Sequence, residues 1–169
     1  MRTLKAFATA AIVAATAGSA VADNVPMDVS HGILLGQVFD PGKAVDVTTS
    51  TLNQGKLYRV DAETRAYDAD LGKIYVALTP DQSKVYEIWA IRHFDSSAPC
   101  RDLRDELIDS LKAEYPDAQM ERAMMSMDGR ESLTKGDTEI SAGCKTGIGK
   151  ATFYLRHRHT ALHQQVAER

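Results

Sequence analysis

The chain has 169 residues, of which 44% are apolar and 25% charged, and its formal net charge is −3. This length is too short for a multidomain enzyme, and the apolar share is too high for a disordered tail. A nucleic-acid surface needs clustered lysine and arginine, and the acidic balance leaves no such surplus. We therefore expect a small globular protein that does not bind nucleic acid.

The N-terminus has the pattern of a signal peptide over residues 1–22. Arg2 and Lys5 precede a short apolar run, which is shorter than the ~20 apolar residues that span a bilayer. Ala20 and Ala22 form the A-x-A pattern that signal peptidase accepts, because its pocket admits only small side chains. We expect cleavage after Ala22 and a single domain over residues 23–169. The protein should then be periplasmic or secreted and should not span the membrane.

Cys100 and Cys144 are the only two cysteines of the chain. In an oxidising compartment, an unaccompanied pair of thiols usually forms a disulfide. Their spacing excludes a C-x-x-C redox motif, and two cysteines are too few for a cysteine zinc site. A reactive or intermolecular thiol is the alternative. The sequence predicts a Cys100–Cys144 disulfide, worth about 4 kcal/mol in the chain-entropy model.

Strands are predicted in the first half of the chain from hydrophobic alternation. The apolar stretch 31–39 lies before the turn signal Asp40-Pro41-Gly42, and it fits either a strand or one short helix. Alternation then predicts strands over 57–62 and 73–78. The run 85–94 places apolar side chains on both faces, which is typical of a central strand.

The strongest helix signal extends from about Pro99 to Tyr115, and Pro116 ends it. Cys100 lies on the apolar stripe of this helix, so a disulfide would tie the start of the helix to a later strand. Asp105 lies on the opposite, solvent-facing side. The apolar residues at helical spacing are Leu103, Leu107, Ile108, Leu111 and Tyr115.

The last third of the chain predicts strands over 119–127, 138–144 and 150–157, with a turn at Asp128-Gly129. The residues after Thr160 form a short terminal helix or fray. This order of elements indicates an α+β fold, in which one main amphipathic helix packs on an antiparallel sheet built from hairpins.

The predicted order is a weakly indicated helix, three strands, a strongly indicated helix and three more strands. This order resembles a known arrangement. It is similar to the tandem helix-plus-meander proteins, such as the beta-lactamase inhibitor protein family and the outer-membrane-assembly lipoproteins. Gly36-Gln37-Val38-Phe39-Asp40 is similar to the glycine-led start of the first helix in those families. The Leu-Gly-x-Pro turn that usually follows is missing, as is a lipobox cysteine. The resemblance implies two α-β-β-β repeats and carries over no functional residue.

No sequence motif indicates a catalytic residue. The chain has no Gly-x-Ser-x-Gly elbow. Residues 143–150 resemble a phosphate-binding loop, but five residues separate Gly143 from Gly149, and Ala151 takes the place of the Ser or Thr that would bind magnesium. A hairpin loop explains these glycines as well.

The leading expectation is that the protein has no cofactor. Histidines and methionines suggest an alternative, in which the protein binds copper or zinc. His157 and His159 lie two apart and His163 four further, so they could converge if a helix begins near Thr160. Met120 and Met124, with Met125 and Met127, provide soft thioether ligands of the kind that bind Cu(I). Solvent-exposed histidines and ordinary core methionines are the competing interpretation.

Two groups of residues are candidates for a binding surface. Arg92 and His93 lie beside Asp95 at the end of a strand, where they would hold an anion, act in acid–base chemistry or face solvent. Tyr154, Arg156 and Arg158 alternate on the expected solvent face of the last strand.

The leading functional hypothesis follows by elimination. Without a catalytic signature, we expect an exported, non-enzymatic protein that binds a protein or an envelope component through the exposed face of its sheet. Tyrosines are enriched in binding surfaces. The candidates are Tyr58, Tyr75, Tyr86 and Tyr154.

Overall fold

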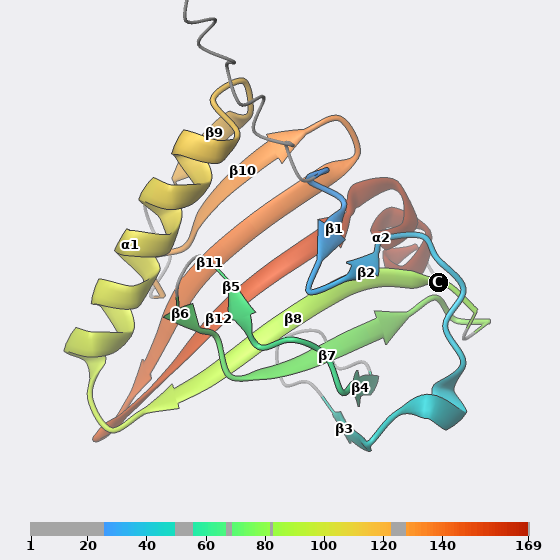
Figure 1. The fold of residues 1–169 in the computed structure, drawn as a ribbon, viewed down its shortest axis with the longest axis horizontal. Helices are drawn as coiled ribbons and strands as arrows, with labels where there is room; N and C mark the ends of the chain where they lie inside the picture. Colours follow the sequence, from blue (N-terminus) through green and yellow to red (C-terminus); the bar gives the residue numbers. More distant parts are fainter. Residues whose placement is uncertain (1–25, 50–55, 67–68, 82, 123–127, 169) are drawn as a thin grey trace, which may run out of the picture.

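The computed structural model describes residues 26–49, 56–66, 69–81, 83–122 and 128–168. The expected signal peptide lies outside these ranges, as does Met124. Eight strands form one antiparallel sheet in the order β3-β4-β7-β8-β12-β11-β10-β9 (Figure 1). Two further pairs of short strands, β1–β2 and β5–β6, form separate small hairpins.

The large sheet consists of two four-stranded meanders that meet at their last strands. The first contains β3 (Asp46–Thr49), β4 (Lys56–Arg59), β7 (Lys73–Leu78) and β8 (Val85–Phe94). The second contains β9 (Gln119–Arg122), β10 (Glu131–Lys135), β11 (Thr138–Gly147) and β12 (Lys150–His159). β8 and β12 pair antiparallel at the centre of the sheet.

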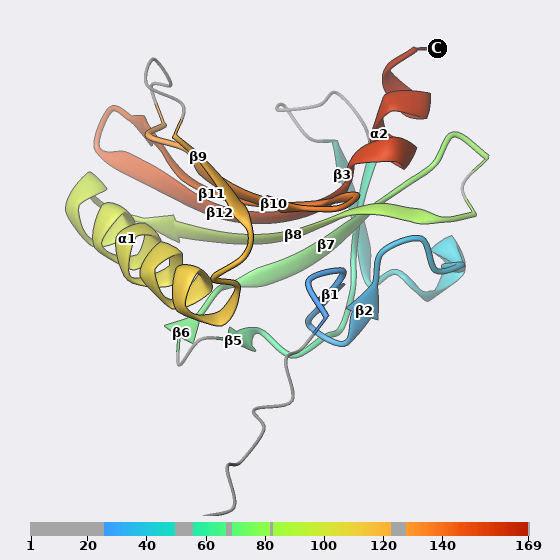
Figure 2. The ribbon, with the colours of Figure 1, turned by 90° about the horizontal axis from the view of Figure 1, so that it is seen from above.

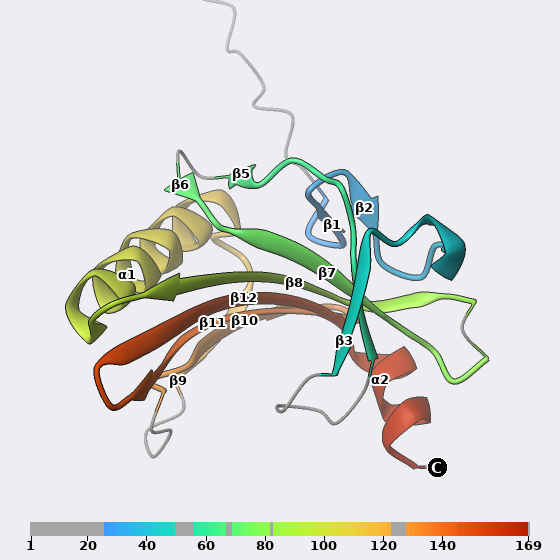
Figure 3. The ribbon, with the colours of Figure 1, turned by 90° about the horizontal axis from the view of Figure 1, so that it is seen from below.

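The remaining elements cover the two faces of the sheet unequally. Helix α1 (Ser97–Glu114) connects the meanders, and helix α2 (Thr160–Ala167) follows β12. Figure 2 shows α1 and both small hairpins on one side of the sheet and α2 on the other. We call these sides the α1 face and the α2 face. The sheet is curved and strongly twisted, and its hollow side is the α2 face (Figure 3).

The α1 face carries the main hydrophobic core. As predicted, Leu107, Ile108 and Leu111 of α1 are buried, whereas Asp105 is exposed. These three side chains pack on the alternating apolar residues of β11, β12 and β8, because those side chains point to the same side of the sheet. The predicted disulfide between Cys100 and Cys144 is present, with a Cα–Cα distance of 5.9 Å, and it joins the start of α1 to β11.

The first half of the chain departs from the expected helix-led repeat. Residues 31–39 form no α-helix; they contain β2 (Ile33–Leu34), which pairs with β1 (Val29–Ser30). His31, Gly32 and Gly36 have φ values of 53°, 74° and 80°, and left-handed backbone interrupts a right-handed helix. Before β3, the described residues contain this hairpin, an isolated β-bridge from Val38 to Lys84 and a 3-10 helix, η1 (Pro41–Lys43). The β1–β2 hairpin instead covers part of the α1 face (Figure 2).

The α+β fold with one main helix on an antiparallel sheet is confirmed, and several details differ. Strand β10 was not predicted, nor was β3, the edge strand of the first meander. The terminal segment forms α2 rather than fraying. The second hairpin pairs β5 (Arg65–Ala66) with β6 (Ala69–Asp70). None of the helices in the described part of the chain is both long and apolar enough to cross a membrane.

Candidate functional site

The α2 face carries polar and aromatic side chains of β8, β12 and β11 in lateral rows. Residues directly opposite one another in antiparallel strands point to the same side of a sheet. Each α2-face residue of β12 therefore lies between one residue of β8 and one of β11. From the α2 end of β12, the rows are Glu87–Arg158–Glu139, Trp89–Arg156–Ser141, Ile91–Tyr154–Gly143 and His93–Thr152–Lys145.

The first two rows contain a charged network of Glu87, Glu139, Arg156 and Arg158. The Glu87 side chain is fully buried, and its Oε1 accepts a hydrogen bond from Arg158 Nε at 2.5 Å. Its Oε2 accepts one from Trp89 Nε1 at 3.1 Å. Both arginines also lie 3.5 Å from Glu139. Two carboxylates and two guanidinium groups thus balance each other, as buried charges require.

Arg156 is held on three sides. Its Nε donates to Ser141 Oγ at 3.2 Å, and its guanidinium carbon lies 5.4 Å from the centre of the Trp89 ring, within cation–π range. Burial, and secondarily the neighbouring Arg158, lower the pKa of Arg156, while Glu87 and Glu139 oppose the shift. The expectation that Arg156 and Arg158 face solvent is wrong: Arg156 is 8% exposed and the side chain of Arg158 16%.

A β-bulge in β8 adds an aromatic contact at the α2 end of the network. Glu87 pairs with Ala77 and Val85 with Leu78, so Tyr86 is an extra residue between them. The Tyr86 ring lies on the α2 face and stacks on His163 of α2, with 5.9 Å between ring centres. Burial is the main cause that lowers the pKa of His163, whose Nδ1 lies 3.8 Å from Glu87 Oε1. Helix α2 therefore closes this end of the face.

The last two rows form the floor of a cavity of about 440 Å³, which we call the α2-face pocket. The side chains of Ile91 and Tyr154 provide apolar surface beside the polar pair of His93 and Thr152. His93 Nδ1 lies 3.1 Å from Thr152 Oγ1. The lining residues are Thr48, Thr49, Leu57, Tyr75, Ile91, His93, Lys145, Thr146, Gly147, Lys150, Thr152 and Tyr154.

Tyr154 is fixed from both sides in the floor of the pocket. It is 4% exposed, and its hydroxyl donates a hydrogen bond to Asp128. Burial, together with this bond to a carboxylate, raises the pKa of the Tyr154 hydroxyl. A Cβ at Gly143 would overlap the Tyr154 ring and hydroxyl, so only glycine fits beside it on β11.

The structure separates Arg92 from His93. Arg92 points to the α1 face, where its Nη1 donates to the Asp70 carbonyl at 2.5 Å and its guanidinium carbon lies 5.0 Å from the Phe94 ring centre. His93 points to the α2 face and lines the pocket. Among the predicted tyrosines, Tyr58 belongs to the core of the α1 face, whereas Tyr75, Tyr86 and Tyr154 lie on the α2 face.

The three C-terminal histidines do not gather at one place. His157 and His159 alternate onto the α1 face, while His163 lies on the α2 face. Met120 is 42% exposed on the edge strand β9. Within the described ranges, no group of three or more His, Cys, Asp or Glu side chains is placed to hold a metal ion.

His157 is instead a buried side chain of the core. Neither ring nitrogen makes a hydrogen bond of good geometry, although the Met27 backbone lies close enough to favour the protonated form slightly. Burial, with a smaller contribution from His31, lowers the pKa of His157 to about 3. The ring is therefore neutral at neutral pH.

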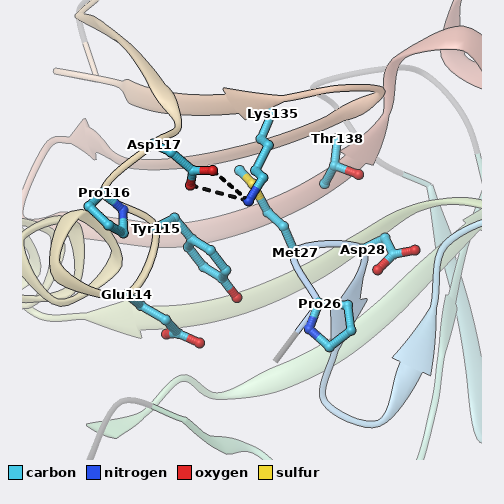
Figure 4. Close-up of a pocket in the computed structure, with 9 residues that line it drawn as sticks. All are labelled: Pro26, Met27, Asp28, Glu114, Tyr115, Pro116, Asp117, Lys135 and Thr138. Carbon is cyan, nitrogen blue, oxygen red and sulfur yellow. Dashed lines mark hydrogen bonds and ion pairs between the residues drawn. The ribbon is translucent and has the colours of Figure 1, made fainter. Parts of the chain in front are cut away.

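A second cavity, of about 590 Å³, lies on the α1 face between residues 26–28, the end of α1 and strand β10. Figure 4 shows Lys135 directed at Asp117, and their ion pair measures 2.9 Å. Asp28 and Glu114 are the other charged residues of the described lining. Because its one lysine is already paired, the α2-face pocket is the stronger candidate for a binding site.

No protein-family model, curated protein or solved structure matches this chain. Sequence reasoning identified His93 and Tyr154 but missed Glu87, Lys145 and Lys150. Glu87 carried a usable signal, because an isolated carboxylate inside a strand that is apolar on both faces needs a buried partner.

Proposed function

We propose that this protein is an exported, non-enzymatic binding protein that holds an envelope component in the α2-face pocket. The observation that supports this most directly is the pocket itself. Its volume of about 440 Å³ lies within the range of roughly 300–1,000 Å³ typical of small-molecule sites. It combines an apolar floor with a few hydroxyl and charged groups, which is the usual composition of such sites.

The supporting residues make the floor of the pocket rigid before any ligand arrives. Tyr154 is fixed by Asp128 and by Gly143, and the adjacent row is fixed by the Arg156–Trp89 contact. A preorganised site loses less conformational entropy on binding than a mobile one. The charged network therefore acts on binding through the position of the floor.

Binding accounts for the pocket residues better than catalysis does. His93 and Thr152 place a base beside a hydroxyl, but a catalytic pair also needs a third group that orients the base. Within the described residues, the bond to Thr152 is the one hydrogen bond of the His93 ring. Tyr154 does not act as a base at neutral pH, because its raised pKa keeps the hydroxyl protonated.

Export is the second part of the proposal, and two features support it. Residues 1–22 have the pattern of a signal peptide, the kind of segment that directs a chain out of the cytoplasm. The Cys100–Cys144 disulfide is the kind of bond that persists in an oxidising compartment.

The test is to purify the mature protein from its native envelope and to identify co-purifying small molecules by solvent extraction and mass spectrometry. Thr152→Tyr would fill the pocket from its floor. Thr134→Tyr is the matched control, because Thr134 is also half-buried and on the α2 face but lies outside the pocket lining.

We expect a molecule that is retained by the wild type and by Thr134→Tyr and is lost from Thr152→Tyr. Equal retention by both variants would place the site elsewhere. Absence of any retained molecule from the wild type would refute the proposed function.

A further inference from the structure

The α2-face pocket is basic at one end, although the whole chain is acidic. Lys145 of β11 and Lys150 of β12 are both exposed and line the pocket beside His93. No Asp or Glu side chain belongs to the described lining. Residues 50–55, which lie outside the described ranges, contain no charged residue in the sequence. The positive charge at this end is therefore not balanced within the lining.

Neither lysine is engaged in an ion pair with any described residue, in contrast to Lys135 and Lys112 elsewhere on the surface. Lys145 lies opposite Thr152, and Lys150 lies opposite Gly147, so both amino groups extend from the hairpin between β11 and β12. An ammonium group at a pocket mouth attracts an anion without first losing a protein partner.

The apolar part of the pocket begins immediately beyond this basic end. Thr152 and Tyr154 are neighbours on the same face of β12, about 7 Å apart for two residues of an extended strand. Tyr154 adjoins Ile91, and Tyr75 and Leu57 continue the apolar surface towards β4. A bound molecule that contacts the lysines is thus within a few ångströms of the apolar floor.

On this basis, and resting on the proposed function, we infer that the ligand is a small amphipathic anion. Its carboxylate would lie between Lys145, Lys150 and the hydroxyl of Thr152. Its hydrocarbon part would cover Ile91, Tyr75 and Leu57. The charged end provides orientation, and the apolar end provides most of the buried area.

The experiment uses three soluble probes on the purified mature protein after removal of bound molecules. Octanoate carries both parts of the inferred ligand, 1-octanol carries the chain without the charge, and acetate carries the charge without the chain. Isothermal titration calorimetry measures each affinity. We expect saturable octanoate binding that is at least about tenfold tighter than binding of 1-octanol, equivalent to about 1.4 kcal/mol, and no measurable acetate binding.

Charge reversal tests the role of the two lysines. Lys145→Glu/Lys150→Glu should weaken octanoate binding by about tenfold or more, because like charges then face each other. Its effect on 1-octanol should be small. Lys43→Glu is the control: Lys43 is an exposed lysine of η1 outside the pocket lining, and this variant should bind octanoate like the wild type. Thermal melting of each variant verifies that it is folded.

The outcomes separate this inference from the proposed function. If 1-octanol binds as tightly as octanoate, if octanoate does not bind, or if the double charge reversal has no effect, the anion selectivity is refuted. The proposed function then still stands if a co-purifying molecule is lost from Thr152→Tyr. If no such molecule exists, both are refuted.

Discussion

The two faces of the central sheet differ in what they bury. On the α1 face, a helix, two small hairpins and a disulfide enclose an almost entirely apolar core. On the α2 face, a short helix covers a charged network at one end and leaves a pocket at the other. The same strands therefore provide stability through one set of side chains and a candidate binding site through the alternate set.

This contrast has an energetic meaning. Apolar burial stabilises a fold in proportion to the area removed from water. A buried ion network gains little net stability, because desolvation offsets the attraction between the charges, and it becomes costly once one member is removed. The α1 face should consequently tolerate conservative apolar changes, whereas the α2 face should respond sharply to the loss of a single charge.

The largest effect is expected on the α1 face. Leu107 is 2% exposed beneath the middle of α1, and Leu107→Ala should lower the free energy of unfolding by roughly 2–5 kcal/mol. Asp105→Ala, on the outer side of the helix, should cost under about 0.5 kcal/mol. Chemical denaturation measures both. Equal losses for the two variants would contradict the orientation of α1.

The disulfide comes next. Replacing both cysteines, as Cys100→Ala/Cys144→Ala, should destabilise the protein by about 4 kcal/mol in the chain-entropy model. Both positions are buried, so alanine creates no unsatisfied polar group. Denaturation of the variant, compared with the disulfide-bonded wild type, gives the value. A denatured but unreduced wild-type sample should also contain no free thiol, and two reactive thiols would refute the bond.

Removing one charge from the charged network should lower the free energy of unfolding by about 3 kcal/mol. Glu87→Gln removes the carboxylate charge and leaves Arg158 with only its longer ion pair, to Glu139, and removing one charge of a buried pair costs about 3–5 kcal/mol. Lys135→Ala breaks an exposed pair instead, and its loss should be much smaller. If the two variants are equally stable, the network contributes no more than a surface ion pair.

A smaller effect is expected from pH. The pKa of His157 is about 3 in the folded protein, against about 6.5 for an unperturbed histidine. Below pH 6.5, the unfolded chain takes up a proton that the folded chain does not. The contribution of neutral His157 to the free energy of unfolding is therefore complete above pH 6.5. It is lost as the pH falls, and the loss reaches about 2 kcal/mol at pH 5.

His157→Leu tests this contribution directly. His31, whose pKa is also lowered by burial, remains in the variant. The loss of stability between pH 7 and pH 5 should therefore shrink by about 2 kcal/mol without disappearing. Denaturation at both pH values measures the change, and an unchanged loss would mean that His157 is protonated in the folded protein.

The sequence predicted the features that depend on local pattern. The Leu103–Leu111 stripe of α1 repeats at helical spacing, and two cysteines allow a single intramolecular pairing. The N-terminal hairpin escaped prediction because residues 31–39 are apolar without a clear period. The residues with left-handed backbone exclude a helix here, but their φ values are known only from the structure.

The candidate site was harder to predict because it depends on long-range register. Glu87 and Arg158 are 71 residues apart, and nothing in either strand alone indicates the pairing. Without that partner, Arg156 and Arg158 look like solvent-facing residues of an alternating strand. Tyr154 was correctly placed on the same face as the two arginines, but its burial follows from Asp128 and Gly143.

The junction of the two meanders also has a consequence for how the chain folds during synthesis. β8 ends at Phe94, and its central partner β12 begins only at Lys150, after α1 and three further strands. Contacts between distant segments form late, because closing the loop costs entropy first. Until β12 is available, β8 has an unpaired apolar edge, which is a hazard for aggregation. We expect the first meander to need protection by a chaperone until the last 20 residues have emerged.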